Sequence, residues 1–276
     1  MIHTLRARAA LPLVLAAAVL ASAAQAADDP LAAAIASPAR TAKFAARDVY
    51  RHPSETLRFF GLRPDQTVVE IWPGRGWYTE ILAPYLREHG KYYAAIEAPD
   101  VAGAPREAKE DAAYLRQRIA DDPAHFGKVI VTELLPPQRV EICPPGSADL
   151  VLTFRNVHNW IEAGYQQAQF DVFFKALKPG GVLGVVEHRA RPGASLEEMR
   201  KSGYVDEAYV RKLAANAGFR FDAESPINDN PKDTKDYPQG VWTLPPTLAL
   251  ADRDRARYLA IGESDRMTLR FVKPAK

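Results

Sequence analysis

Two carboxylates and a pair of glycines have the types and spacing of a site that binds a nucleoside. Glu70 lies in the apolar run 67–71, Gly74 and Gly76 follow it, and Glu97 ends the next apolar run. A glycine turn between a strand and a helix presents backbone N–H groups to a ligand, and an acid at the tip of the second strand accepts hydrogen bonds from ribose hydroxyls. The spacing predicts an adenosine-type ligand, with a purely structural tight turn as the alternative.

A second set of polar residues follows the apolar runs 148–154 and 182–188. The carboxyl ends of parallel strands lie on one edge of a sheet, so these residues are expected to meet the glycine turn. They are Arg155, Asn156, His158, Asn159, Trp160, Glu187, His188 and Arg189. We expect His158 to act as a general base, because imidazole titrates near physiological pH, and Asn156 to orient the acceptor or the cofactor.

Each of these catalytic assignments has a structural alternative. His158 would then bond a backbone carbonyl, and Glu187 and His188 would form a hydrogen-bonded pair. The histidines form no i, i+4 pair of the kind found in helical zinc sites, and the single Cys143 excludes a cysteine-based metal centre. We predict no metal site, and the absence of a Gly-x-Ser-x-Gly or Walker-type motif disfavours hydrolase and NTPase functions.

Strand-like and helix-like segments alternate from residue 67 onward. Strands are expected at 67–71, 91–97, 128–134, 148–154, 182–188, 220–223 and 267–272, and helices at 78–89, 106–119, 166–177 and 206–219. The last strand is expected to run antiparallel to its neighbour. The alternation predicts an α/β fold: a Rossmann-like, mostly parallel seven-stranded sheet with helices on both faces.

Two segments of the chain lie outside this alternation. Residues 27–61 are expected to form an N-terminal helical segment in which Ser54 caps a short helix that ends at Gly61. Residues 228–246 are polar, contain several prolines and are too long for a simple connection, so we predict a lid-like loop there. Residues 27–276, with both of these segments included, read as a single domain.

Residues 1–26 have the features of a cleavable signal peptide. Arg6 and Arg8 precede a short apolar run, and small residues favour cleavage after Ala26. We therefore expect a periplasmic or secreted protein without stable membrane insertion. Removing these two arginines changes 36 basic and 34 acidic residues to 34 of each, which gives no electrostatic reason to bind nucleic acid.

With these motifs in order, the chain resembles the class I S-adenosylmethionine-dependent methyltransferases. The glycine turn, the ribose acid and the Leu-Lys-Pro-Gly-Gly run at 177–181 carry this resemblance. Residues 69–78, 155–160, 230–237 and 240–246 are similar to a group of exported bacterial proteins usually called predicted methyltransferases. The likeness extends over nearly the whole of residues 27–276.

The resemblance implies that S-adenosylmethionine is the cofactor and that a small or medium-sized molecule accepts the methyl group. The cofactor-binding residues it implies are Glu70, Trp72, Pro73, Gly74, Gly76, Tyr78, Glu97 and Arg155. Trp72 stands where the class usually has a glycine, so the first turn is expected to be built differently or to narrow the pocket. The alternative function is a non-catalytic exported protein that keeps the fold and binds another small molecule. Thr79 breaks the Gly-x-Gly-x-x-Gly pattern that a dehydrogenase-like nucleotide binder needs.

Overall fold

A seven-stranded sheet forms the centre of the protein in the computed structural model, which describes residues 29–102 and 104–275. The predicted signal peptide lies outside these residues. The strand order is β3-β2-β1-β4-β5-β7-β6. The strands are β1 (Thr67–Ile71), β2 (Lys91–Glu97), β3 (Ile130–Leu134), β4 (Ala148–Phe154), β5 (Leu177–His188), β6 (Arg220–Glu224) and β7 (Arg266–Val272). Neighbours among β1 to β5 pair in parallel, whereas β7 is antiparallel to both β5 and β6, which confirms the predicted fold class and the direction of the last strand.

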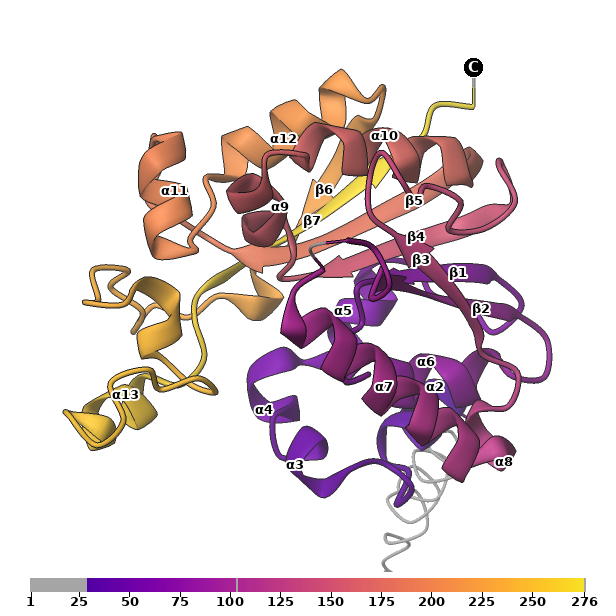
Figure 1. Ribbon diagram of the computed structural model, residues 1–276, viewed down its shortest axis with the longest axis horizontal. Coiled ribbons are helices and arrows are strands. Elements are labelled where there is room, and N and C mark those ends of the chain that lie inside the picture. The colour runs from indigo at the N-terminus through magenta and orange to yellow at the C-terminus, as the bar shows by residue number, and fades with distance from the viewer. Residues whose placement is uncertain (1–28, 103, 276) are drawn as a thin grey trace, which may run out of the picture.

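Helices cover both faces of the sheet (Figure 1). The helices are α2 (Pro30–Ile35), α3 (Ala42–Ala45), α4 (Asp48–Arg51), α5 (Pro53–Phe59), α6 (Thr79–Leu86), α7 (Arg106–Asp121), α8 (Pro123–Phe126), α9 (Val157–Ala163), α10 (Gln166–Ala176), α11 (Leu196–Ser202), α12 (Glu207–Asn216) and α13 (Arg255–Ile261), with short 3₁₀ helices η1 (Pro226–Asn228) and η2 (Gly240–Thr243). Helices α9, α10 and α12 pack on one face, and α2, α5, α6 and α7 on the other.

The central strands are largely apolar because they are buried on both sides. In β1, Val68 and Val69 belong to the cores on opposite faces of the sheet, and in β4 Leu150 and Val151 do the same. Successive side chains of a strand point to opposite faces, so a strand covered by helices on both sides needs apolar residues at consecutive positions. This burial fixes the positions at which β1 and β4 end, and therefore where the loops after them begin.

Two details of the expected element boundaries are wrong. The Lys-Pro-Gly-Gly run does not end a helix before the fifth strand, because β5 begins at Leu177 and includes it. There Lys178 Nζ lies 2.9 Å from Asp149 Oδ1, at the end of the sheet opposite to the glycine turn. Ser54 does not cap α5, since the helix starts at Pro53 and the Ser54 hydroxyl instead accepts a hydrogen bond from Arg58.

Residues 228–246 and α13 form a small apolar cluster beside the end of the sheet (Figure 1). Tyr204, Tyr237, Leu244 and Tyr258 pack together there, and Asp233 accepts a hydrogen bond from the Tyr204 hydroxyl at 3.0 Å. The segment is thus a folded part of the protein, and its action as a lid stays a prediction. In the part of the chain that the structure describes, no helix combines the length and the apolar character needed to cross a bilayer.

Candidate functional site

The turn after β1 has positive φ angles at Trp72 as well as at its two glycines. Trp72 has φ 47°, Gly74 φ 56° and Gly76 φ 86°, all in the left-handed region that favours glycine. The Trp72 indole N–H donates to the Leu134 carbonyl at 2.9 Å, and its ring lies edge-on to Trp160 at 6.0 Å. Trp72 therefore adopts a backbone conformation that favours glycine and adds an aromatic wall.

A pocket of about 490 Å³ opens beside this turn, at the carboxyl ends of β1, β2 and β4. Trp72, Gly74, Glu97 and Asn156 are among the residues that line it. Burial raises the pKa of Glu97 to about 7, and the nearby Asp111 and Glu107 carboxylates add to the shift. A Cβ on Gly74 would lie 3.3 Å from the Asp111 carboxylate, so glycine keeps this end of the pocket open.

A second pocket of about 290 Å³ shares Trp72, Gly74 and Asn156 with the first. Its wall includes Glu70, which accepts hydrogen bonds from the Thr79 hydroxyl at 3.1 Å and from the Tyr92 hydroxyl. Burial raises the pKa of Glu70 to about 7. The two pockets thus lie on either side of the glycine turn and meet at the same three residues.

Most of the predicted cofactor residues line one or both pockets. Those that do are Glu70, Trp72, Pro73, Gly74, Tyr78, Glu97 and Arg155. Gly76 lines neither pocket, and a Cβ there would lie 3.2 Å from both Leu115 and Thr79, so this glycine lets α7 approach the turn from behind. Trp160, one of the residues expected to meet the glycine turn, contacts Trp72 but is fully buried in the core and lines neither pocket.

Asn156 has a structural task in addition to its place in both pockets. Its side-chain amide donates to the Ile71 carbonyl at 2.8 Å and to the Thr153 hydroxyl at 3.2 Å. These bonds tie the end of β1 to the end of β4. The amide N–H groups are therefore occupied, and only the amide oxygen of Asn156 is free for the predicted orienting role.

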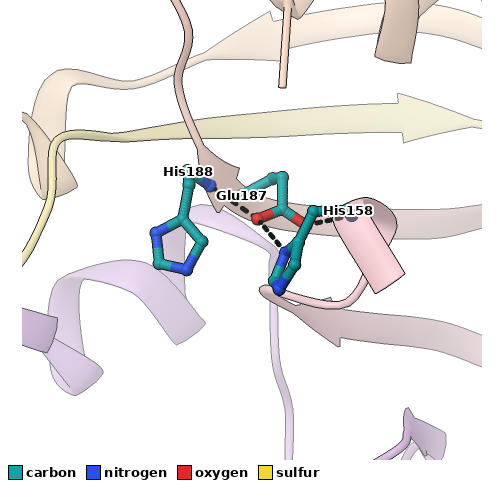
Figure 2. A group of neighbouring side chains, drawn as sticks. All are labelled: His158, Glu187 and His188. Carbon is teal, nitrogen blue, oxygen red and sulfur yellow. Dashed lines mark hydrogen bonds and ion pairs between the residues drawn. The ribbon is translucent and has the colours of Figure 1, made fainter. Parts of the chain in front are cut away.

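Glu187, His158 and His188 come together where β5 ends and α9 begins (Figure 2). The fully buried Glu187 carboxylate accepts hydrogen bonds from the backbone N–H groups of Val157 at 2.6 Å, His158 at 3.3 Å and His188 at 2.7 Å. The same carboxylate lies 3.1 Å from His158 Nδ1. The side-chain partner of Glu187 is therefore His158. Glu187 and His188 do form the hydrogen-bonded pair of the structural alternative, but through the His188 backbone N–H, because His188 Nδ1 bonds the Ser264 hydroxyl at 2.5 Å.

This dyad gives His158 the geometry of a general base. The carboxylate of Glu187 holds an N–H at Nδ1, which leaves the Nε2 lone pair to accept a proton. His158 lines neither pocket, and its ring lies 5.2 Å from His188 and edge-on to Trp242 at 6.1 Å. Trp242 belongs to the segment predicted to be a lid, so that segment covers the side of the imidazole.

The same three residues have the ligand types of a metal site, with one candidate atom from each within 4.8 Å of the others. The Glu187 oxygens already accept four N–H groups, so binding a metal would break the cap of α9. Burial lowers the pKa of His188 well below its usual value, and the charges of Arg155, Arg266 and Arg51 contribute. A dication would therefore lie beside several guanidinium groups, and the donor set fits a hydrogen-bonded dyad better than a metal centre.

Several arginines gather around Glu263; the sequence interpretation named Arg155 but did not predict that these residues form a cluster. The nearly buried Glu263 carboxylate accepts from Arg47 Nε at 2.6 Å, Arg266 Nη1 at 3.1 Å and Arg51 Nε at 3.4 Å. These charges, together with Arg155, hold the pKa of Glu263 down to about 2 against its burial. We call these five residues the arginine cluster.

The sheet order and the turn after β1 define the class I methyltransferase fold. Similar solved structures include an S-adenosylmethionine-dependent methyltransferase from Aquifex aeolicus, with a TM-score of 0.52, 16% identity and coverage of 83% of this chain and 93% of that one. The [4+2]-cyclase SpnF has a TM-score of 0.54 at 14% identity, with 87% and 86% covered. Phosphoethanolamine N-methyltransferase 2 from Haemonchus contortus, in complex with S-adenosyl-L-methionine, has a TM-score of 0.53 at 14% identity, with 82% and 53% covered.

Comparison with protein-family models gives no match, and neither does comparison with the sequences of curated proteins. At such low identities the similarity to solved structures establishes the fold alone. The presence of a cyclase beside two methyltransferases underlines that this fold does not determine a reaction. The reaction has to be argued from the pockets and the dyad.

Proposed function

We propose that the protein is an exported, periplasmic or secreted S-adenosylmethionine-dependent methyltransferase that acts on a small or medium-sized acceptor. The observation that carries this proposal is the pair of pockets meeting at Trp72, Gly74 and Asn156, with the Glu97 carboxylate in the wall of the larger one. A nucleoside with an amino-acid chain needs two such compartments on either side of a turn. In this proposal Glu97 binds the ribose hydroxyls.

The residues present fit this cofactor. Gly74 keeps open a space that a Cβ would fill, and Glu70, Pro73 and Tyr78 form the wall of the smaller pocket, which would receive the methionine half. The aromatic face of Trp72 borders both halves. S-adenosylmethionine supplies an electrophilic methyl group when bound, so the protein has to align the acceptor and accept its proton.

The Glu187–His158 dyad is the proposed proton acceptor. His158 Nε2 takes the proton of an acceptor hydroxyl or amine, while Nδ1–H donates to Glu187, which stabilises the resulting imidazolium. We also propose that residues 228–246, through Trp242, cover the acceptor beside His158 and exclude water there. The proposed partner is a small molecule and not nucleic acid.

Calorimetric titration of the purified protein with S-adenosylhomocysteine tests the cofactor site. We expect micromolar binding to the natural chain, and a dissociation constant raised by about 10- to 100-fold in Glu97→Ala, because a charge-assisted hydrogen bond to the ribose is lost. Glu110→Ala is the matched control, since Glu110 lies on α7 and pairs with Arg106 on the surface. Absence of binding to a folded natural chain would refute the proposal.

The same titration repeated at different pH values tests the state of Glu97. Its pKa of about 7 is raised above the usual value, so the carboxyl is mostly protonated at pH 6 and ionised at pH 8. Because the ionised form accepts both ribose hydroxyls, the dissociation constant for S-adenosylhomocysteine is expected to fall by about tenfold from pH 6 to pH 8. Glu97→Gln should remove this dependence. If the dependence persists, Glu70, whose pKa is also about 7, causes it.

A further inference from the structure

Several guanidinium donors in the arginine cluster lack an acceptor. The side chain of Arg51 is almost fully buried, and its Nη1 has no hydrogen-bond partner within residues 29–102 and 104–275. The Nε atom of Arg266 is likewise buried without a partner there. The Arg155 side chain makes no hydrogen bond with any described residue, although it lines the smaller pocket with Arg47 and Arg51. Buried donors without acceptors are costly and point to an absent partner.

The orientation of these arginines is set by the fold. The Arg51 guanidinium lies 4.7 Å from the centre of the Trp77 ring, which fixes its plane. Arg155 follows β4 directly and has φ 60°, a left-handed conformation that is strained for a residue with a side chain. The structure thus maintains the cluster at a conformational cost, which is typical of a functional site.

The charges of the cluster do not balance. Four guanidinium groups face the carboxylate of Glu263, and Glu70, with its pKa raised to about 7, is the one other acid that lines the smaller pocket within the described residues. Even with Glu70 ionised, an excess of two positive charges remains. Burial and the neighbouring Arg266 and Arg47 lower the pKa of Arg155 to about 10, although Glu263 opposes this shift. Buried charge of one sign is stabilised by a counter-ion of the other sign, so the site is built for an anion.

The proposed cofactor does not supply this anion. Its methionine half carries one carboxylate, but also an ammonium and a sulfonium group, and so brings net positive charge to the smaller pocket. The cofactor bound beside these arginines would therefore increase the excess of positive charge. The remaining ligand of a methyltransferase is the acceptor, and this step of the argument rests on the proposed function.

We propose that Arg47, Arg51 and Arg155 bind a carboxylate or phosphate group of the methyl acceptor. The planar guanidinium presents paired N–H donors that match both groups, and several such forks around one pocket favour a small acid over a neutral compound. The smaller pocket, of about 290 Å³, is lined both by Glu70, Pro73 and Tyr78, against which the methionine half is proposed to lie, and by Arg47, Arg51 and Arg155. These arginines would hold the anionic end of the acceptor beside the methionine half in the same pocket. The acceptor class is therefore a small organic acid or phosphate ester with a hydroxyl or amino group to methylate.

Calorimetric titration with inorganic phosphate and with citrate, at constant ionic strength set by sodium chloride, tests this site. We expect both anions to bind the natural chain and to bind equally well when S-adenosylhomocysteine is already present. Arg155→Gln is expected to raise the dissociation constant of phosphate by about tenfold or more, because a charged hydrogen-bond donor is lost. Arg106→Gln, at an exposed arginine of α7, is the matched control and should change nothing.

A competition experiment with the natural chain distinguishes whether the arginines bind the carboxylate of the cofactor or an anionic group of the methyl acceptor. This experiment needs no variant. If phosphate weakens the binding of S-adenosylhomocysteine but not of 5′-methylthioadenosine, which lacks the amino-acid half, the arginines hold the cofactor carboxylate and the proposal is overturned. If neither anion binds a chain that does bind S-adenosylhomocysteine, the anion site is refuted and the proposed function stands. If the anions bind and S-adenosylhomocysteine does not, the proposed function fails, and with it the assignment to an acceptor. If Arg106→Gln weakens the binding of phosphate as much as Arg155→Gln does, the effect comes from the overall charge of the protein and not from a specific anion site.

Discussion

Replacing Glu263 by glutamine is expected to lower the free energy of unfolding by about 3–5 kcal/mol, because it leaves buried arginines without their counter-charge. In a chain of this size such a loss lowers the melting temperature by roughly 10 °C. Differential scanning calorimetry at pH 7 measures both quantities. Glu224→Gln removes an acid of similar type from an exposed ion pair with Arg211 and should cost well under about 1 kcal/mol.

The pH dependence of stability checks the same residue. The pKa of Glu263 is about 2 in the folded protein and lies below its usual value of 4.5, so the charged form is favoured by folding. The stability that this group contributes is therefore fully present above pH 4.5 and is lost as the pH falls toward 2. Glu263→Gln should show a shallower decline over this window. A variant as stable as the natural chain would mean that the cluster is not held by this carboxylate.

Replacing His158 by alanine is expected to reduce methyl transfer by about 10²- to 10⁴-fold while leaving the affinity for S-adenosylhomocysteine nearly unchanged. The reason is that Nε2 is the proposed base and that the ring lines neither of the two cofactor-sized pockets. Release of S-adenosylhomocysteine is measured with a panel of small hydroxy and amino acids and their phosphate esters. The rates of the natural chain and of His158→Ala are then compared with the acceptor that the natural chain methylates fastest.

His125→Ala is the matched control for this experiment. His125 is a partly exposed histidine that also pairs with a carboxylate, Asp122, but it lies in α8 away from both pockets. It should keep full activity. An unchanged rate in His158→Ala would assign the dyad a purely structural role as the cap of α9, whereas a lower rate with an altered pH profile would support proton transfer.

Much of the architecture follows from the apolar pattern of the sequence. The ranges expected for the second and fourth strands agree with β2 and β4, because consecutive apolar residues bounded by glycine and proline leave few alternatives. The neighbourhood of His158 and Glu187 is also within reach of the sequence, since β4 and β5 are parallel neighbours and Phe154 lies opposite Val186. Which histidine the carboxylate would bond depended on side-chain geometry.

The arginine cluster could not be predicted from the pattern of the sequence. Arg51 and Arg266 are far apart in the sequence, and they meet only because β7 inserts between β5 and β6 and places Arg266 opposite His188. The conformation of Trp72 was equally hidden, because a tryptophan gives no signal for a positive φ. In both cases long-range packing decides, and local sequence preference does not.

The place of β7 in the sheet has a consequence for the order of folding. A nascent chain emerges with its N-terminus first, so β1 to β5 are complete before β7 is made. Until then β6 has no partner, because β7 is its only neighbour among the strands that the structure describes, and the edge of β5 is open to association with other chains. Arg51 and Arg155 also lack Glu263 at that stage. The pairing of β7 with β5 and β6 is therefore a late step of folding, in which the sheet is completed and the charges of the arginines are partly compensated. Chains that end before β7 are expected to aggregate.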